Sequence, residues 1–255
     1  MDTNVPALVL RHANGWRMGL ANMLAKENFA WWRTRRWWIQ CLIALFFLNF
    51  FMAMNLGLGS ISNAVNAYLY IAGAVAPVAA IIMGQDAILG ERLSGTAAWV
   101  LSKPIQRPAF ILSKLIAYGA GLLATWVVLP GVVAILELTV VSKVHLPVAG
   151  FVGAMGLIYL NLLFYLTLTL MLTTLLHGRG AVLGIAIFLV WGWMIKPFGV
   201  LLADVMPWRL LLEPALGGYL LQGEPLPTVA PIIATALWCV LFTGVAIWRI
   251  SREEF

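Results

Sequence analysis

Charged residues are scarce in this sequence. Of its 255 residues only 10% are Asp, Glu, Lys or Arg, whereas 62% are hydrophobic. An ordinary soluble domain carries about 25% charged residues, so this chain has too few to cover a hydrated surface. The shortage excludes a soluble globular enzyme and a disordered tail. The two cysteines are too few for a disulfide scaffold, and both fall in apolar stretches.

The sequence also lacks the short motifs of nucleotide and hydrolytic chemistry. It has no Gly-x-x-x-x-Gly-Lys-Ser/Thr loop for ATP phosphates, no His-Glu-x-x-His and no Gly-x-Ser-x-Gly. Its histidines, His12, His145 and His177, fall on different predicted loops. We therefore predict no metal site, no bound cofactor and no catalytic residue in this chain.

Long charge-free windows are what the sequence does contain. A bilayer span needs about 20 apolar residues, and a transmembrane barrel would show short alternating segments instead. The longest window is broken by a turn-rich stretch, 57–63, which divides it into two helices. The windows predict an all-α integral membrane protein with six transmembrane helices, at 37–57, 64–85, 109–137, 148–176, 181–203 and 228–249.

The distribution of basic residues predicts the orientation of these spans. An even number of spans places both termini on one side. The positive-inside rule makes that side the cytoplasm, so we predict a multi-pass protein of the cytoplasmic (inner) membrane. Thirteen of the sixteen Lys and Arg residues then lie inside, and Lys143, Lys196 and Arg209 lie outside. The net charge of +6 thus reflects topology and lipid attraction, not nucleic-acid binding.

An amphipathic segment, 16–36, precedes the first span. Its apolar residues follow helical spacing, and arginines and tryptophans gather near its end. Indole rings prefer the headgroup region, and basic side chains prefer anionic lipid. We predict an interfacial helix whose characteristic residues are Lys26, Glu27, Trp31, Trp32, Arg33, Arg35 and Arg36. A simple lipid anchor and a direct functional role both fit this pattern.

The segment 86–108 is long for a bare connection between antiparallel helices, and long loops are often functional. Its pattern predicts a short helix around Asp86–Arg92, a break at Ser94-Gly95, a second helix from Thr96 to Ser102 and a stop at Pro104. Such a mixed charged and apolar surface suits docking to another protein.

The strings Glu91-Arg-Leu-Ser-Gly-Thr96 and Leu101-Ser-Lys-Pro-Ile-Gln-Arg107, followed by Ser113-Lys114, resemble the cytoplasmic signature of ABC-2 type transporter permeases. The run Ala25-Lys-Glu27 before the arginine-rich stretch is similar to the connecting helix of that family. Six spans and a length near 250 residues agree, so the likeness covers essentially the whole chain. One departure is Ala97-Ala98-Trp99, where relatives often carry a leucine-rich or acidic stretch.

The resemblance implies the type V ABC exporter architecture. Two copies of the permease would stand side by side as a homodimer, joined to two copies of a cytoplasmic ABC ATPase that holds Mg-ATP. The segment 86–108 would be the coupling helix seated in that ATPase. A subunit without a nucleotide site must be moved through a rigid contact. The residues implied in coupling are Asp86, Glu91, Arg92, Ser94, Gly95, Thr96, Pro104 and Arg107.

Three polar residues in or at the ends of spans are candidates for a substrate path: Glu137, Asn49 and Lys196. Glu137 ends the third predicted span, whereas Lys196 can simply extend to the headgroups. The segment 204–227 contains four prolines and apolar pieces too short to span, so we predict short extracytoplasmic helices there.

Two functions fit this architecture. The first is a permease subunit that exports a substrate with energy from a separate ATPase. The second is a membrane subunit that passes ATP-driven motion to a periplasmic partner without moving cargo. The short outer loops offer such a partner only a small surface. A third class, a membrane-embedded enzyme, lacks the necessary acid–base or metal residues.

Overall fold

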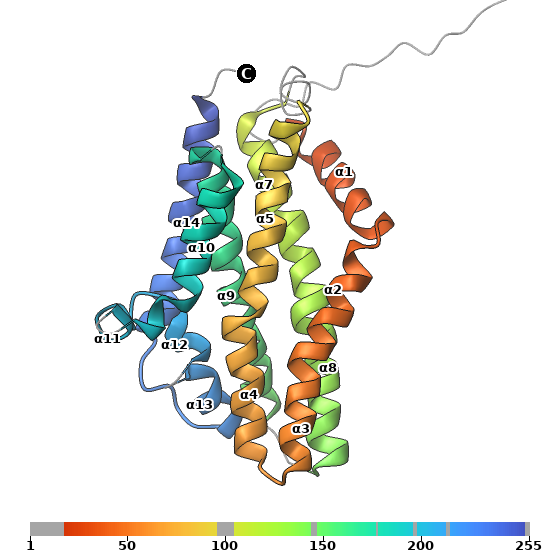
Figure 1. The fold of residues 1–255 in the computed structure, drawn as a ribbon, viewed down its shortest axis with the longest axis vertical. Helices are drawn as coiled ribbons and strands as arrows, with labels where there is room; N and C mark the ends of the chain where they lie inside the picture. Colours follow the sequence, from red (N-terminus) through yellow and green to blue (C-terminus); the bar gives the residue numbers. More distant parts are fainter. Residues whose placement is uncertain are drawn as a thin grey trace, which may run out of the picture.

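The computed structural model describes residues 18–95, 105–143, 147–176, 178–195, 198–212 and 215–252. The regular elements in these ranges are helices (Figure 1). The helices between residues 20 and 93 are α1 (Leu20–Arg33), α2 (Arg36–Ala44), η1 (Leu45–Phe50), α3 (Phe51–Gly57), α4 (Ile61–Ala74) and α5 (Ala76–Leu93). Those that follow are α7 (Arg107–Leu122), η2 (Leu123–Val128), α8 (Leu129–Leu136), η3 (Glu137–Val141), α9 (Val148–Leu175), α10 (Arg179–Trp191), η4 (Gly192–Met194), α11 (Phe198–Leu201), α12 (Trp208–Leu211), α13 (Leu216–Gln222) and α14 (Ala230–Ser251).

Several of these elements join into long apolar helices. Within the described ranges, five runs have the length and hydropathy to cross a membrane: Trp37–Gly57, Ile61–Leu93, Arg107–Val141, Val148–Leu175 and Ala230–Ser251. Each has at least the roughly 20 residues that a span requires. The chain is therefore a helical, multi-pass membrane protein.

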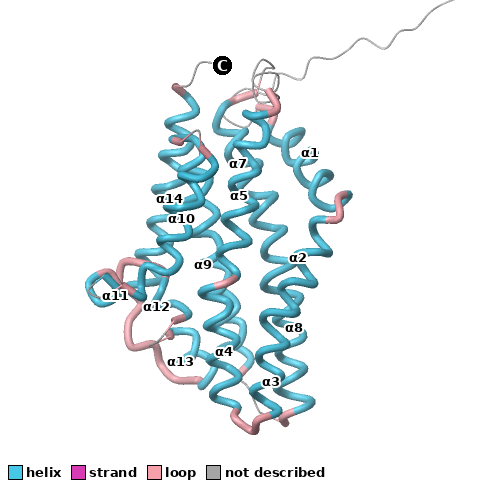
Figure 2. The backbone as a smooth tube through the Cα atoms, in the orientation of Figure 1, coloured by secondary structure: helices cyan, strands magenta, loops and turns pink. Residues whose placement is uncertain are grey.

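The long helices lie side by side along the long axis of the molecule, and α9 packs among α5, α7, α13 and α14 (Figures 1 and 2). At one end α5, α9 and α14 end, and α7 and α10 begin. This end carries Arg92, Arg107, Arg179 and Arg252, and we call it the basic end. It lies at the top of Figure 1, and α1 lies beside it. The end where α3 ends and α4 begins is called the opposite end.

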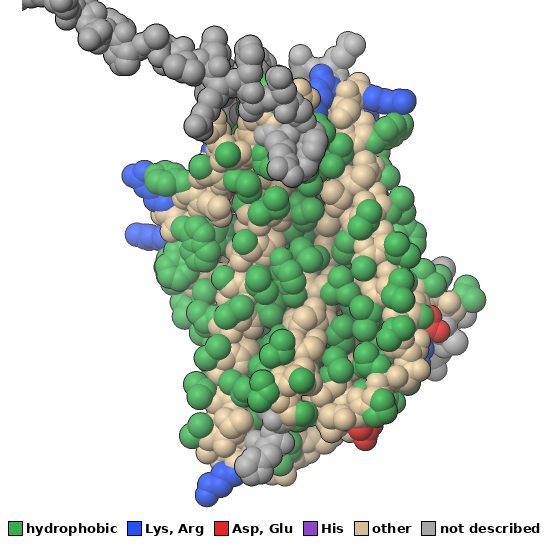
Figure 3. Space-filling view, turned by 180° about the vertical axis from the view of Figure 1, so that it is seen from behind, with side chains coloured by type: hydrophobic (Ala, Val, Ile, Leu, Met, Phe, Trp, Pro, Cys, Tyr) green, Lys and Arg blue, Asp and Glu red, His purple; other side chains and the backbone are tan. Residues whose placement is uncertain are grey.

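The side of the bundle is apolar. Figure 3 shows hydrophobic side chains spread over most of one face, with basic side chains mainly at the basic end. The helix α14 and the first long helix are the most exposed of the five, and their outward side chains include Leu42, Phe46, Leu237 and Val240. A helix that is apolar on all sides is typical of a membrane span, because lipid replaces water around it.

The second long helix extends beyond its prediction. We expected a span to end at residue 85 and a loop to follow, but α5 runs without a break to Leu93. Gly95 follows it with φ +71°, a left-handed conformation that glycine adopts without steric cost. Asp86, Glu91 and Arg92 therefore lie on the last turns of the continuous helix α5, not on a separate short one.

The predicted helix 181–203 also differs from the structure. The helix α10 ends at Trp191, a single 3₁₀ turn continues to Met194, and α11 begins at Phe198. The Leu189 carbonyl accepts a hydrogen bond from Nε1 of Trp208 at 2.8 Å and one from the Tyr165 hydroxyl at 3.3 Å. These side chains satisfy a carbonyl near the helix end in place of a further turn. The prediction of one continuous helix did not anticipate them.

Polar bonds join the first and third long helices. Asn49 donates from Nδ2 to the Pro130 carbonyl at 3.0 Å, and Trp126 donates from Nε1 to Gln40 at 2.8 Å. Asn49 and Trp126 lie in π-helical turns, η1 and η2, and a third such turn, η3, begins at Glu137. Inserted π turns often occur at functional sites.

Candidate functional site

A cluster of four charged side chains joins three helices at the basic end. The ammonium group of Lys114, on α7, lies 3.0 Å from Oε1 of Glu27 on α1 and 3.1 Å from Oε1 of Glu91 on α5. Lys26 on α1 binds the same Glu91 oxygen at 2.7 Å. The positive charges of the two lysines thus balance the negative charges of the two glutamates. We call these four residues the charge cluster.

Burial makes these contacts costly to disrupt. The Lys114 side chain is only 1% exposed and Glu27 7%, whereas Lys26 is 48% exposed. The ammonium also lies 4.8 Å from the centre of the Phe110 ring, a cation–π contact. Removing one partner of a buried ion pair typically costs about 3–5 kcal/mol, because the remaining charge has lost its compensation. The buried part of the cluster therefore constrains α1, α5 and α7 strongly.

The sequence of α1 explains why a carboxylate faces the bundle. Met23, Glu27 and Trp31 are the buried residues of this helix, and their spacing of four places them on one face. Trp31 is 4% exposed, and its ring lies against Gly121 of α7 and edge-on to Tyr118. Glu27 therefore lies one turn before Trp31, whose contacts with Gly121 and Tyr118 seat α1 on α7.

The aromatic and basic residues near the end of α1 divide into two groups. Trp31 was predicted as a headgroup residue but is buried in the bundle. Trp32 is 47% exposed and contacts Trp37, and the exposed Arg33 lies over the Phe29 ring at 4.9 Å. Arg35 is also exposed. The side chain of Arg36 lies outside the described residues. The lipid-facing role stays a prediction for Trp32, Arg33 and Arg35.

Two arginines of the predicted coupling segment cap helices of their own chain. Arg92 donates to the carbonyls of Thr173 and Thr174, at 2.5 and 3.5 Å, where α9 ends. Arg107 donates to the carbonyls of Ile250 and Ser251 at 2.9 Å, where α14 ends. Helix C-termini carry partial negative charge and unpaired carbonyls, so a guanidinium is favourable there.

We expect Arg107→Gln to loosen the last turn of α14. The substitution removes a charge at the helix C-terminus, an interaction worth about 0.3–1 kcal/mol, together with two hydrogen bonds to carbonyls. Hydrogen exchange measured by mass spectrometry should show faster exchange in the last turn of α14. Arg252→Gln is the matched control: it also removes a charge at this helix end, but the Arg252 guanidinium lies over the Trp248 ring at 4.5 Å, so the control tests the hydrogen bonds of Arg107. Equal acceleration in both variants would contradict the capping role.

Three further predicted coupling residues, Asp86, Ser94 and Gly95, lie near the end of α5. Asp86 is 3.8 Å from Arg179, and the Ser94 hydroxyl donates to the Gly90 carbonyl at 2.8 Å. Gly95 ends the helix, as described above. Thr96 and Pro104 lie outside the described residues. The structure thus brings Asp86, Glu91, Arg92 and Arg107 to the same end of the bundle.

Of the three candidates for a substrate path, the structure describes Asn49 and Glu137, which have different surroundings. Asn49 is buried and bonded to Pro130. Glu137 lines a cavity of about 440 Å³ at the opposite end. Lys196 lies outside the described residues. Of the two described candidates, Glu137 is therefore the one that lies beside a cavity.

The model of one protein family matches residues 29–255, nearly nine-tenths of the chain. The chain belongs to this family, DUF2705. Its description is "Protein of unknown function". The match begins within α1 and includes α5, α7 and the later helices, so Glu91 and Lys114 of the charge cluster lie inside it.

Two curated proteins are similar to this DUF2705 chain over most of its length. A protein named "Probable ABC transporter permease protein NosY" from Pseudomonas aeruginosa is 27% identical over 222 residues, covering 77% of this chain and 78% of the relative. A protein of the same name from Stutzerimonas stutzeri is 25% identical over 219 residues, covering 76% and 79%.

Sequence reasoning missed the central residue of the charge cluster. Lys114 was recognised as part of a motif but was given no role of its own. One signal was available: Lys114 and Glu137 are the two charged residues within the predicted span 109–137. A charge inside a span usually has a partner, but sequence position does not say which one.

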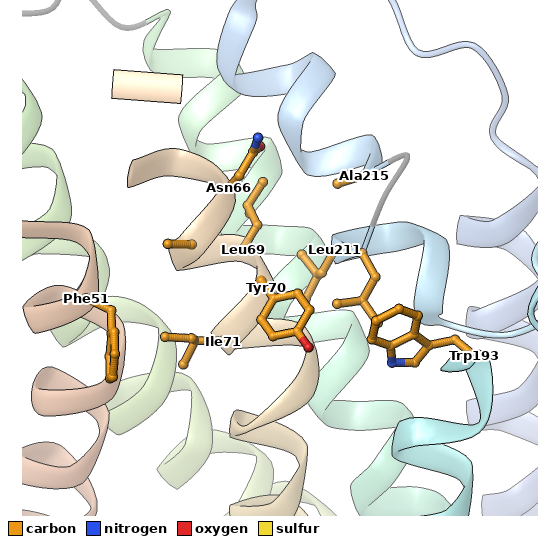
Figure 4. Close-up of a pocket in the computed structure, with 10 residues that line it drawn as sticks. Phe51, Asn66, Leu69, Tyr70, Ile71, Trp193, Leu211 and Ala215 are labelled. Carbon is orange, nitrogen blue, oxygen red and sulfur yellow. The ribbon is translucent and has the colours of Figure 1, made fainter. Parts of the chain in front are cut away.

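A second feature without a sequence signal is an apolar cavity of about 510 Å³ between α4, η4 and α12. The Tyr70 ring meets the Trp193 indole edge-on at 6.0 Å beside it (Figure 4). Its lining residues come from segments far apart in the sequence. Separately, within the described ranges no three His, Cys, Asp or Glu side chains are grouped to hold a metal ion.

Proposed function

We propose that this chain is the membrane subunit of an ATP-driven ABC-2 type transporter with the type V exporter architecture. The names of the two relatives and their similarity over more than three-quarters of the chain support this assignment. The apolar helical bundle and the loop motif support it independently. The chain would export a substrate across the cytoplasmic membrane as a homodimer, with energy from two copies of a separate ATPase that binds Mg-ATP.

In this proposal α10 and η4 form a sixth, shorter crossing. Together they cover Arg179–Met194, roughly 24 Å at about 1.5 Å per residue, whereas the hydrocarbon core is about 30 Å thick. The helices α12 and α13 pack against α9 below the end of α10 and would complete that side (Figure 1). The positive-inside rule then places the basic end, with both termini, in the cytoplasm.

The charge cluster is the observation that carries the coupling part of the proposal. Glu91 lies at the start of the predicted coupling segment, and Lys114 lies in the helix that follows that segment. Glu27 and Lys26 belong to the helix before the first span. A force applied to the end of α5 would therefore reach α1 and α7 together through Glu91 and Lys114.

The contacts of the arginines refine the roles implied by the family resemblance. Arg92 and Arg107 donate to the ends of α9 and α14 within the chain. We propose that they hold these helices in place beside the ATPase. Direct contact with the ATPase would then be made mainly by other groups at the basic end, including the exposed Asp86.

Alanine substitution of Glu91 in the complete transporter tests the coupling role. Coupling free energies are typically about 1–3 kcal/mol, so we expect transport and permease-dependent ATPase activity to fall by about tenfold. Both are measured after co-purification with the ATPase and reconstitution into vesicles. Glu224→Ala, an exposed acid at the opposite end, is the control. Unchanged activity and assembly in the Glu91 variant would refute the coupling assignment.

A further inference from the structure

The cavity at the opposite end contains an acid whose charge has no counter-ion among the described residues. The cavity has a volume of about 440 Å³ and is lined by the end of α3, the following turn, the start of α4 and the end of η3. Oε2 of Glu137 is buried and forms no hydrogen bond within the described part of the chain. A buried carboxylate oxygen without a donor is costly, so this atom is poised to accept one.

A second buried group, the Tyr68 hydroxyl, interacts with Glu137. The hydroxyl of Tyr68, on α4, is buried and has no hydrogen-bond partner within the described ranges. Tyr68 is 3% exposed, and its hydroxyl interacts electrostatically with the Glu137 carboxylate. Two helices thus each carry a buried oxygen atom without a partner among the described residues, and of Tyr68 and Glu137 it is Glu137 that lines the cavity.

The helix ends around the cavity add further negative character. The first long helix ends at Gly57, and the third ends at Val141; both residues line the cavity. At the end of α3 the amides of residues 58–60 donate to the carbonyls of Met54, Asn55 and Leu56. This helix end therefore acts on the cavity mainly through its dipole, a partial charge equivalent to about −0.5. The start of α4 is positive by the same argument, but the Ser60 hydroxyl accepts from the Asn63 amide and caps it.

The rest of the lining is apolar. Ala53, Leu56, Ile61 and Val141 surround the acid. The occupant favoured by this composition has a positive head that donates hydrogen bonds and a short hydrocarbon body. We propose that the Glu137 cavity binds an organic ammonium group.

Metal ions fit the cavity less well. Calcium takes 6–8 oxygen ligands and magnesium requires a near-octahedral set, and one carboxylate supplies few of them. An ammonium group offers three donors, and it needs only one of them to satisfy Oε2 of Glu137. Lys143 is the nearest basic residue along the chain; it is exposed and forms no ion pair with Glu137.

Binding to the full chain in phosphatidylcholine nanodiscs tests the proposal, and it requires neither ATPase nor transport. The probe is n-butylammonium chloride, measured by isothermal titration calorimetry, with n-butanol as the neutral analogue. We expect the ammonium to bind and butanol to bind at least tenfold more weakly. Equal binding of both, or binding of sodium or magnesium ions in place of butylammonium, would overturn the proposal.

Two variants separate the acid from general stability. Glu137→Gln keeps the shape of the side chain and is expected to weaken butylammonium binding at least tenfold, whereas Glu224→Gln should leave it unchanged. Should Glu137→Gln fail to fold, Leu56→Lys provides an independent test, because its own ammonium would occupy the cavity and abolish probe binding. Retained binding in Glu137→Gln, or in a folded Leu56→Lys variant, contradicts the assignment.

The same chemistry can come from a lipid headgroup or from a soluble amine. Nanodiscs that contain phosphatidylethanolamine distinguish these sources. If phosphatidylethanolamine lowers the affinity for butylammonium, the lipid amine is the occupant. If the affinity for butylammonium is unchanged, the occupant is a soluble amine.

Discussion

Lys114→Met is expected to destabilise the folded protein by about 3–5 kcal/mol, the cost of breaking a buried ion pair from one side. The substitution removes the ammonium that lies 3.0 and 3.1 Å from Glu27 and Glu91. The Glu27 carboxylate then stays buried, with the exposed Lys26 as its nearest cation, at 3.9 Å. The free energy of unfolding, measured by denaturant titration in mixed micelles, provides the test.

Lys26→Met is the matched control for this experiment. It removes the same charge from the same cluster, but the side chain is 48% exposed, and exposed ion pairs contribute about 0–1 kcal/mol. Although the two lysines share partners, we expect their substitution to lower the free energy of unfolding by very different amounts. A similar loss of stability in both variants would show that burial does not determine the strength of the cluster.

Neutralising the glutamates should restore most of the stability lost in Lys114→Met. In the triple variant with Glu27→Met and Glu91→Met, no carboxylate of the cluster stays buried without a cation. Replacing a whole buried ion pair with hydrophobic residues of similar volume is often neutral. Failure of this rescue would indicate that the lysine stem, not its charge, holds α1 and α5 against α7.

The helical bundle was predictable from sequence because lipid imposes a simple constraint. Backbone groups in a membrane must bond within their own helix, so apolar windows of sufficient length indicate helices directly. The break around Gly57–Asn63 was also readable, and the structure has its turn at Leu58–Ser60. The end of α10 could not be predicted from sequence, because the indole of Trp208, from another segment, donates to the Leu189 carbonyl.

The candidate site was less accessible to sequence reasoning. The motif identified Glu91, but its partner Lys114 lies on another helix, and Glu27 is 87 residues from Lys114. Trp31 and Trp32 are adjacent in a basic, aromatic run, and the residues themselves do not reveal which one enters the bundle. The position of Gly121 on α7 decides it, through packing that depends on the tertiary structure.

That packing leads to the second large effect. A methyl group at Gly121 would overlap the Trp31 indole, so Gly121→Ala must displace the ring or α1 itself. Overpacking of this kind costs about 1–3 kcal/mol, which exceeds the roughly 0.5–1 kcal/mol that Ala gains over Gly in a helix. The free energy of unfolding should fall, and hydrogen exchange in α1 should accelerate.

The control and the double variant identify the cause of this effect. Gly156→Ala, on α9, has no atom within 4 Å of the added methyl group, so it should be neutral or slightly stabilising. In a Trp31→Ala background the indole is absent, and Gly121→Ala should then cost little. Such non-additivity is the signature of two residues in direct contact. Additive effects would mean that Gly121 acts on α7 alone, and that the seating of α1, which holds Glu27 against Lys114, does not depend on this contact.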